Sequence, residues 1–319
     1  MGEEIQGSAR DAQREAHWTK AIPRARDRWQ SRWLVAVVGA WLALMSADAV
    51  RWARTFGIRF PVFVLEVFVL SAAFAVIVRK LRAATLGGAV CGGMICLLVT
   101  FWTGVQRASV VRSGLTPLVL LFLLTFLATR AGRRRKVEAG LAEGRRGRNA
   151  GQVIANLSVA GICTSPWTPW MLGGHVGLIF TGGAIWMKAT CLAALVEATA
   201  DTVSSEIGQA FGGTPVMITT LRRVKAGTDG AVTALGSCAG VVGGAVVALA
   251  GGWAMRLGMA AAMIALVAGV CGLFFDSVVG ATVERRGWVG NDLVNFASTA
   301  FAGGVAMFEI WLLGRGVLR

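Results

Sequence analysis

The feature that most constrains this chain is a series of continuous apolar segments, each close to twenty residues long and separated by short basic stretches. About 20 apolar residues in a helix cross the roughly 30 Å hydrocarbon core of a bilayer. The segments lack the period-two alternation that marks the strands of a transmembrane barrel, whereas a helix satisfies its own backbone hydrogen bonds in lipid. The sequence therefore predicts an all-α, polytopic transmembrane helix bundle of about nine spans.

Composition supports this class and argues against a soluble protein. Hydrophobic residues make up 55% of the 319 residues and charged residues only 15%, which lies outside the usual range of soluble domains. The net charge of +15 comes from basic residues between the apolar segments, as the positive-inside rule describes for cytoplasmic loops. Membrane lipids are therefore expected partners, and nucleic acid is not. The six cysteines show no metal-type spacing and are expected to be packing residues.

Two regions are expected, a charged cytoplasmic tail over residues 1–32 and a single transmembrane domain over residues 33–319. The expected spans are Trp33–Val50, Phe60–Val78, Ala84–Gly104, Gly114–Thr129, Gln152–Met171, Val176–Ala200, Val232–Trp253, Leu257–Val279 and Phe296–Leu313. Pro166 and Pro169 interrupt the fifth span, and Lys188 lies inside the sixth. A re-entrant segment in this part of the chain is therefore the alternative.

Basic loops predict the orientation of the bundle. Residues 79–82 and 130–148 are the most basic connections in the first half of the chain, and such loops remain on the cytoplasmic side. Four crossings from a cytoplasmic N-terminus agree with both loops, and nine would place the C-terminus outside. The expected location is a bacterial-type cytoplasmic membrane or an organellar inner membrane.

Small residues recur every four positions in the seventh expected span. They are Gly236, Gly240, Gly244, Ala248 and Gly252. Such a stripe lets two helix backbones approach closely in a membrane. We therefore expect it to pack tightly against a neighbouring helix.

The segment EATADTVSSEIG carries several acidic side chains where the sixth span ends. Glu197 and Asp201 are one helical turn apart, and Thr202 and Glu206 form a neighbouring pair. Carboxylates near a membrane span are costly unless they are paired, hydrated or bound to a cation. Mg²⁺ suits them because it takes hard oxygen ligands and bridges carboxylates to substrate phosphates. The alternative is that these groups face water or pair with basic side chains.

A basic, glycine-containing loop follows in the segment ITTLRRVKAGTDGAVTALG. Its candidate residues are Arg222, Arg223, Lys225, Gly227, Thr228 and Gly230. Flexible glycines expose backbone N–H groups, and the helix N-terminus that follows adds partial positive charge, so the arrangement suits phosphate. The loop is not a P-loop, because GxxxxGK[ST] is absent. A simple connector between helices is the alternative.

A second acidic segment, FDSVVGATVERRGWVGNDLVNFAST, joins the last two spans. Asp276 lies near the end of an apolar span, and Glu284 lies in the expected loop. Asn291, Asp292 and Asn295 open the last span. Asp292 could cap that helix or ligate a cation, but capping does not account for Asp276.

A polar stripe enters the fifth span in the segment GRRGRNAGQVIANLSVAG, where Arg148, Gln152 and Asn156 recur every four residues. These side chains lie on one helix face. Such a stripe lines either a cavity or a helix contact, and we expect a cavity.

These four elements, in this order, resemble the integral-membrane family called domain of unknown function 92. The resemblance covers about residues 83–313 and is carried by RNAGQVIAN, ATADTVSSEIG, ITTLRRVKAGTDGAVTALG and DSVVGATVE with NDLVNFAST. The family includes transmembrane-protein-19-like proteins and the plant phytyl-phosphate kinase. Membership implies a multi-helix membrane protein, and the plant branch implies phosphorylation of an isoprenoid monophosphate to the diphosphate by a nucleoside triphosphate. A weaker similarity to dolichol kinases and CDP-diacylglycerol synthases implies CTP and Mg²⁺.

The resemblance leads to the hypothesis of a Mg²⁺-dependent kinase that uses CTP or another nucleoside triphosphate and accepts a phytyl or prenyl monophosphate. The carboxylates assigned to Mg²⁺ are Asp201, Glu206, Asp276 and Asp292. The groups assigned to catalysis are Asp201, Arg222, Arg223 and Lys225. The groups assigned to nucleotide binding are Gly227, Thr228, Gly230, Arg148, Asn156, Asn291 and Asn295. Whether Asp201 and Asp276 face each other is left open by the sequence.

Two other classes of function remain open at this point. One is an ion- or proton-coupled transporter with a path lined by Glu66, Lys188, Glu197, Asp201 and Glu309. We find no internal inverted repeat of the kind that transporters often carry. The other is a non-catalytic membrane scaffold, from which nucleotide binding would distinguish the kinase.

Overall fold

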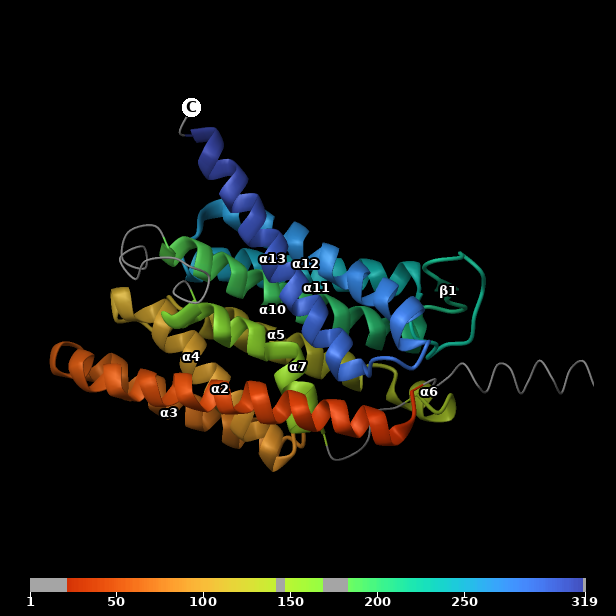
Figure 1. Ribbon diagram of the computed structural model, residues 1–319, viewed down its shortest axis with the longest axis horizontal. Coiled ribbons are helices and arrows are strands. Elements are labelled where there is room, and N and C mark those ends of the chain that lie inside the picture. Colours follow the sequence, from red (N-terminus) through yellow and green to blue (C-terminus); the bar gives the residue numbers. More distant parts are fainter. Residues whose placement is uncertain (1–21, 142–146, 169–182, 318–319) are drawn as a thin grey trace, which may run out of the picture.

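The computed structural model describes residues 22–141, 147–168 and 183–317, and within them the chain forms a helical bundle (Figure 1). The helices are α2 (Arg24–Arg59), α3 (Pro61–Lys80), α4 (Leu86–Gly104), α5 (Leu115–Arg130), α6 (Arg133–Glu138), α7 (Ala150–Thr164), α10 (Gly183–Phe211), α11 (Ala234–Ala254), α12 (Gly258–Val279) and α13 (Asn291–Val317). A 3₁₀ turn (Val105–Arg107) and a π turn (Gly280–Glu284) extend α4 and α12. Strands β1 (Val216–Met217) and β2 (Ala231–Val232) form a small antiparallel pair.

The prediction of an all-α membrane bundle is confirmed. In the described part of the chain, α2, α3, α4, α11, α12 and α13 are long and apolar enough to cross a membrane, and α5 and α7 are shorter apolar helices. Each predicted span overlaps one helix, although the number and direction of crossings stay predictions. The possible re-entrant segment falls largely on residues 169–182, outside the described residues.

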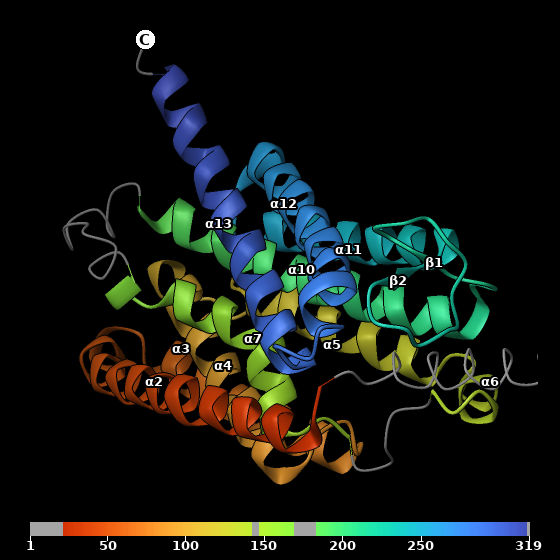
Figure 2. The same cartoon turned by 45° about the vertical axis from the view of Figure 1, so that its right-hand side comes forward.

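Helix α10 lies at the centre of the bundle (Figure 2). It packs against α11, α12 and α13 on one side and against α5 and α7 on the other. The segment from Cys191 to Val196 is fully buried. Helices α2 and α3 lie at the opposite side of the molecule from α11 and α12 (Figure 1). Since other helices surround α10, its charged side chains face protein rather than lipid.

The glycine stripe of α11 packs against neighbouring helices, as predicted: Gly236, Gly240 and Gly244 against α10, and Gly252 against Ala262 of α12. A Cβ atom on Gly240 would lie 2.5 Å from the carbonyl oxygen of Ala200, and one on Gly236 would lie 2.6 Å from that of Ser204. Real Cβ contacts are longer than this, so only glycine permits the observed approach of the two backbones.

The first helix begins earlier than predicted, at Arg24 rather than Trp33. Its first turns contact the connection between α12 and α13. The guanidinium of Arg26 donates to the carbonyl oxygen of Gly287 at 3.0 Å, and the amide of Gln30 donates to that of Trp288 at 2.7 Å. The last residues of the predicted tail therefore belong to the folded domain.

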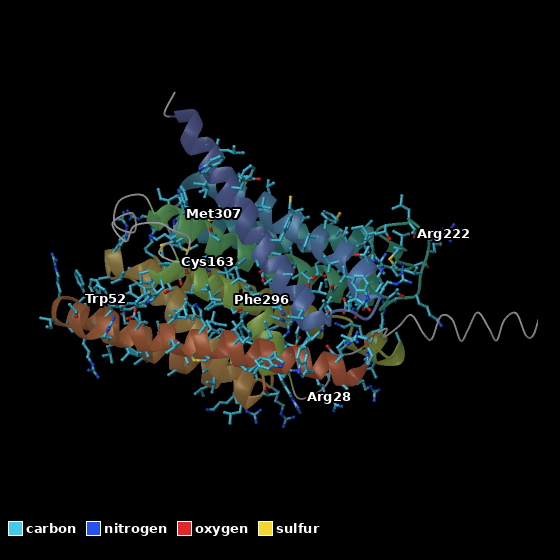
Figure 3. The ribbon with its side chains drawn as sticks, viewed as in Figure 1. Arg28, Trp52, Cys163, Arg222, Phe296 and Met307 are labelled. Atoms are coloured by element: carbon cyan, nitrogen blue, oxygen red, sulfur yellow. The ribbon has the colours of Figure 1, made fainter. Side chains whose placement is uncertain are left out.

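One end of the bundle carries α6, the β1–β2 pair and the start of α2 (Figure 1), and we call it the basic end. Figure 3 shows Arg222 at this end and Trp52 at the other. The segment from Arg133 to Lys136 is an uninterrupted basic run in α6. All four sequence elements singled out for chemistry lie at or near the basic end.

The close contact between α10 and α11 yields a stability prediction. We expect Gly240→Ala to lower the free energy of unfolding by about 1–3 kcal/mol, because the added methyl group overpacks the interface. Gly304→Ala on α13 is the matched control, since a Cβ there meets nothing within 4 Å and alanine favours helix by up to about 1 kcal/mol. Thermal unfolding of both variants in detergent checks this. Equal midpoints would contradict the tight packing of α11.

Candidate functional site

Three carboxyl groups from two helices lie near one another inside the bundle, close enough to interact electrostatically. Glu197 and Asp201 come from α10, and Asp276 comes from α12. Glu197 is close enough to interact electrostatically with both of the others, and Asp276 interacts with Asp201. The approach depends on Gly272, because a Cβ atom there would lie 2.6 Å from the side chain of Glu197. Asp201 and Asp276 are therefore close enough to interact electrostatically.

These carboxyl groups are poorly compensated. Glu197 is only 1% exposed, and one oxygen of Asp276 is buried with no hydrogen-bond partner among the described residues. Ser298 of α13 lies beside both side chains, but its hydroxyl donates to the carbonyl oxygen of Asn295 at 3.0 Å. An unsatisfied buried polar group costs about 1–3 kcal/mol, and more when it is charged. Arrangements that cost stability in this way are typical of functional sites.

Two further carboxylates, which we had not assigned to the site, join the cluster. The π turn after α12 turns Glu284 inward, where it is 8% exposed and interacts electrostatically with Asp201 and Asp229. Gly230 sets the position of Asp229, because a Cβ atom on Gly230 would lie 2.3 Å from the backbone nitrogen of Ala281. We call Glu197, Asp201, Asp229, Asp276 and Glu284 the acidic cluster. π turns occur often at functional sites.

The basic half of the glycine loop lies further out. Arg222, Arg223 and Lys225 are exposed, and Figure 3 shows Arg222 projecting from the outer edge of the basic end. The hydroxyl of Thr228 donates to the carbonyl oxygen of Lys225 at 2.8 Å, and Gly227 has a φ of +85°. The loop thus holds Asp229 against the bundle while its basic side chains face outward.

Glu206 makes a separate interaction. Its carboxylate forms an ion pair of 2.5 Å with the ammonium group of Lys136, which is 2% exposed. Lys136 also donates to the carbonyl oxygens of Ala128 and Thr129 at the end of α5. The structure therefore places Glu206, which we had assigned to Mg²⁺, in a buried pair that joins α10 to α5 and α6.

Asp292 lies at the junction of α2, α7 and α13. It accepts a hydrogen bond of 2.6 Å from the hydroxyl of Ser31, and a Cβ atom on Gly151 would lie 2.5 Å from its carboxylate. Asp27 lies close enough to interact with both Asp292 and Glu284. Asp292 is thus a neighbour of the acidic cluster rather than a member of it.

The two asparagines beside Asp292 lie at the start of α13. Asn291 is exposed, and Asn295 is partly buried. The backbone carbonyl oxygen of Asn295 accepts hydrogen bonds from Ser298 and Thr299. Their positions at the basic end are compatible with nucleotide binding, which stays a prediction.

Arg148 connects the acidic cluster to the rest of the basic end. Its guanidinium contacts the Thr202 hydroxyl at 3.4 Å and interacts electrostatically with Asp201. Its backbone accepts a hydrogen bond from Thr85 and donates one to Ala83, both 2.9 Å long. Gly147 has a φ of +74°, a conformation that glycine adopts readily and that brings the two loops together. Arg148 is therefore held in place by backbone contacts.

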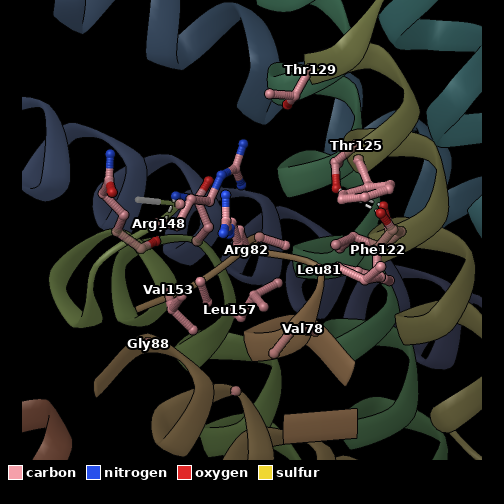
Figure 4. A pocket seen from close by; sticks show the side chains of 18 of the residues that line it. Val78, Leu81, Arg82, Gly88, Phe122, Thr125, Thr129, Arg148, Val153 and Leu157 are labelled. Carbon is pink, nitrogen blue, oxygen red and sulfur yellow. Dashed lines mark hydrogen bonds between the residues drawn. The ribbon is translucent and has the colours of Figure 1, made fainter. Parts of the chain in front are cut away.

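The polar stripe of α7 lines a cavity, as predicted. Arg148, Gln152 and Asn156 all face a cavity of about 720 Å³ among α3, α4, α5, α6 and α7. Figure 4 shows Arg82 and Arg148 side by side in this cavity, with Val153 and Leu157 nearby. Gln152 and Asn149 cap α7 through reciprocal hydrogen bonds, and the amide of Asn156 donates to the Gln152 carbonyl oxygen at 2.8 Å.

The geometry gives little support to an ion path. Glu66 is exposed on α3, and α3 packs mainly against α4 and α2 rather than against α10. Glu309 lies about three turns beyond Ser298 along α13. The residues assigned to transport are therefore spread over the bundle, and only Glu197 and Asp201 lie together.

No three His, Cys, Asp or Glu side chains in the described ranges converge on a point that could hold a metal ion. A complete protein cage for a cation is therefore absent from this part of the chain. Mg²⁺ differs from other metals here, because it commonly uses one or two carboxylates and takes its other ligands from water and substrate phosphates. Asp201 and Asp276 supply two carboxylates of the kind that Mg²⁺ uses, and Mg²⁺ binding stays a prediction.

The two kinds of carboxylate predict opposite effects on stability. Glu206→Gln leaves the buried ammonium of Lys136 without its counter-charge, so we expect a loss of up to about 3–5 kcal/mol. Asp276→Asn removes one of several mutually repelling charges, so we expect equal or greater stability. Thermal unfolding of the two variants in the same detergent is the measurement. A loss at Asp276 as large as that at Glu206 would show that Asp276 has a structural role.

Comparison with known proteins finds relatives along most of the chain. The chain is 28% identical to the uncharacterized membrane protein sll0875 of Synechocystis over 61% of its length and 72% of the relative. It is also 28% identical to the uncharacterized membrane protein MJ0933 of Methanocaldococcus jannaschii over 72% of its length and 87% of the relative. No solved structure matches the chain.

Two relatives come from Arabidopsis thaliana. Identity to the chloroplastic protein VTE6 is 27% over 61% of the chain and 58% of that protein, and identity to protein PGR is 29% over 69% and 78%. The family model described as integral membrane protein DUF92 matches residues 69–303, which hold the acidic cluster, Arg148 and the cavity. The chain is a multi-pass membrane protein and belongs to the DUF92 family of integral membrane proteins.

Proposed function

We propose that this protein is a membrane phosphotransferase that converts an isoprenoid monophosphate into the diphosphate with a nucleoside triphosphate as donor. The observation that carries the proposal is the position of Asp201. On one side it meets Asp276 and the acidic cluster, and on the other it meets Arg148, which lines the cavity. Carboxylates suited to a cation and an arginine suited to an anion thus lie beside each other, which supports phosphoryl transfer. The isoprenoid acceptor, phytyl or prenyl, follows from the family resemblance.

The carboxylates fit Mg²⁺. Asp201 and Asp276 are hard oxygen donors from facing helices, and the buried Asp276 oxygen without a partner is available as a ligand. Bound there with the donor phosphates, Mg²⁺ would offset their negative charge. Glu206 is already paired with Lys136, and Asp292 already accepts a hydrogen bond from Ser31. These two residues would therefore hold the neighbouring helices in place and would not bind Mg²⁺ directly.

The outer loop would bind the donor. Arg222, Arg223 and Lys225 carry positive charge on a loop whose inner half contacts the acidic cluster, and the turn at Gly227 and Thr228 lies between the two halves. CTP or another nucleoside triphosphate would enter from this side, which we take as cytoplasmic. The exposed basic side chains suit its phosphates, as do the backbone N–H groups of the turn.

Arg148 would act on the acceptor. In the reaction, the bond from the γ-phosphorus to its bridging oxygen breaks, and an oxygen of the lipid phosphate forms the new bond to that phosphorus. The products are a nucleoside diphosphate and the lipid diphosphate. An acceptor phosphate is already anionic, so little general-base help is needed. Arg148 would offset the repulsion between the two phosphates and orient the attacking oxygen.

A transfer assay tests this function. Purified protein in detergent is given labelled CTP, ATP, GTP or UTP with phytyl, geranylgeranyl or farnesyl monophosphate and Mg²⁺. We expect diphosphate formation, and a loss of at least about 100-fold in kcat for Asp201→Asn, because the main charge at the donor site is removed. Glu309→Gln, a carboxylate change far from the site, should retain near-normal activity. Absence of transfer and of nucleotide binding would refute the proposal.

The Mg²⁺ dependence of the rate tests the ligand assignment separately. We expect Asp276→Asn to raise the Mg²⁺ concentration that gives half-maximal velocity by at least about tenfold, because one of two protein ligands is lost. Glu206→Gln should leave this concentration near its normal value in whatever protein remains folded. An unchanged Mg²⁺ requirement in Asp276→Asn would exclude Asp276 as a ligand.

A further inference from the structure

The cavity beside α7 is polar at one end and apolar at the other. The polar end is lined by four arginines that come from loops and helix ends. They are Arg82, Arg130, Arg133 and Arg148. The groups at its deep end are Phe74, Gly92, Leu118, Leu121 and Leu157. Leu118 and Arg130 are both on α5, so the cavity follows about 18 Å of that helix. This polarity matches a molecule with one anionic group and one long apolar chain.

We propose that this cavity is the acceptor site, which binds a single-chain lipid monophosphate with its chain among α3, α4, α5 and α7 and its phosphate among the four arginines. The inference rests on the proposed function for the identity of the ligand. The volume of about 720 Å³ falls within the usual range of small-molecule sites, roughly 300–1,000 Å³. Charge complementarity favours an anionic lipid as the ligand, because a neutral lipid has no negative group for the arginines to bind.

Two of the four arginines are brought together by the backbone, and all four line the same cavity. Arg82 has a φ of 55°, and the loop that holds it is joined by hydrogen bonds to the backbone of Arg148. Arg130 lies over the ring of Phe126 at 4.0 Å from its centroid. Figure 4 shows Arg82 and Arg148 facing the same space, with Thr125 and Phe122 across from them. Several guanidinium groups around one space suit phosphate, which accepts bidentate hydrogen bonds.

One wall of the cavity borders the acidic cluster. Ala198, between Glu197 and Asp201 on α10, lines the cavity wall, and Arg148 contacts both the cavity and Thr202. A phosphate held by Arg148 would therefore lie at the boundary between the cavity and the acidic cluster. Lys136 also lines the cavity, but its ammonium is engaged by Glu206. Its charge is already balanced within the pair, so the cavity lining offers a phosphate the guanidinium groups of the four arginines.

Equilibrium binding without nucleotide tests the site independently of catalysis. Purified protein in neutral detergent is titrated with labelled farnesyl monophosphate, with farnesol and inorganic phosphate as competitors in separate arms. We expect farnesyl monophosphate to bind and neither competitor to displace it at equal concentration. Arg133→Gln should weaken binding about tenfold, since a charge-assisted hydrogen bond is lost. Arg134→Gln, the next residue on α6 and not part of the cavity lining, is the matched control and should bind normally.

A second pair of variants tests the chain-binding end. Leu121→Trp fills the cavity and should abolish binding, whereas Leu127→Trp changes a residue of α5 that is 63% exposed and outside the cavity lining. Thermal unfolding midpoints are measured for both variants to check that each is folded. Normal binding by Leu121→Trp and Arg133→Gln would overturn the cavity proposal even if transfer activity is present. If the unchanged protein binds farnesyl monophosphate, these variants lose that binding, and no nucleotide supports phosphoryl transfer, the cavity proposal is supported and the kinase proposal is refuted.

Discussion

The enclosure of α10 by other helices is the constraint on which the rest of the structure depends. A carboxylate exposed to lipid costs several kcal/mol, yet α10 carries Glu197, Asp201 and Glu206. They are tolerated because neighbouring helices enclose them and because basic groups or glycine backbones lie against them. The small residues of α11 and α12 are needed for the same reason, since larger side chains would separate the helices around the charges.

Both basic partners of α10 come from one segment of the chain, the loop and short helix between α5 and α7. Lys136 is buried and balances Glu206, whereas Arg148 is partly buried and faces Asp201. A basic loop of the kind predicted to lie on the cytoplasmic side thus also supplies counter-charges to the interior. The two pairings differ in consequence. The Glu206 pair is satisfied and structural, and the Asp201 group retains unbalanced negative charge beside Asp276.

Sequence reasoning was most successful where one helix carried the whole pattern. Apolar length located the helices, four-residue spacing located the glycine stripe, and the stripe of Arg148, Gln152 and Asn156 located the cavity. Contacts between distant segments were missed. Lys136 and Glu206 are 70 residues apart, and nothing in either segment indicates the other.

Glu284 was assigned to a loop because an ordinary helix would have ended near Val279. The π turn extends α12 and turns the side chain inward, and a short apolar stretch of GATV gives no warning of it. Asp27 was placed in the tail for a related reason, since its segment is too polar to resemble a span. Its contact with the backbone at Gly290 and its electrostatic interaction with Asp292 are apparent only in the structure.

Arg26 and Gln30 donate hydrogen bonds to the connection between α12 and α13, and Ser31 donates one to Asp292 at the start of α13. These bonds join residues separated by 258 to 261 positions. During synthesis the chain emerges from its N-terminus, so α2 is complete long before its partner exists. The contacts between α2 and the segment from Gly287 to Asp292 therefore form only after that segment has been made. Bringing residues so far apart in the chain together also carries a large entropic cost until other helices have packed.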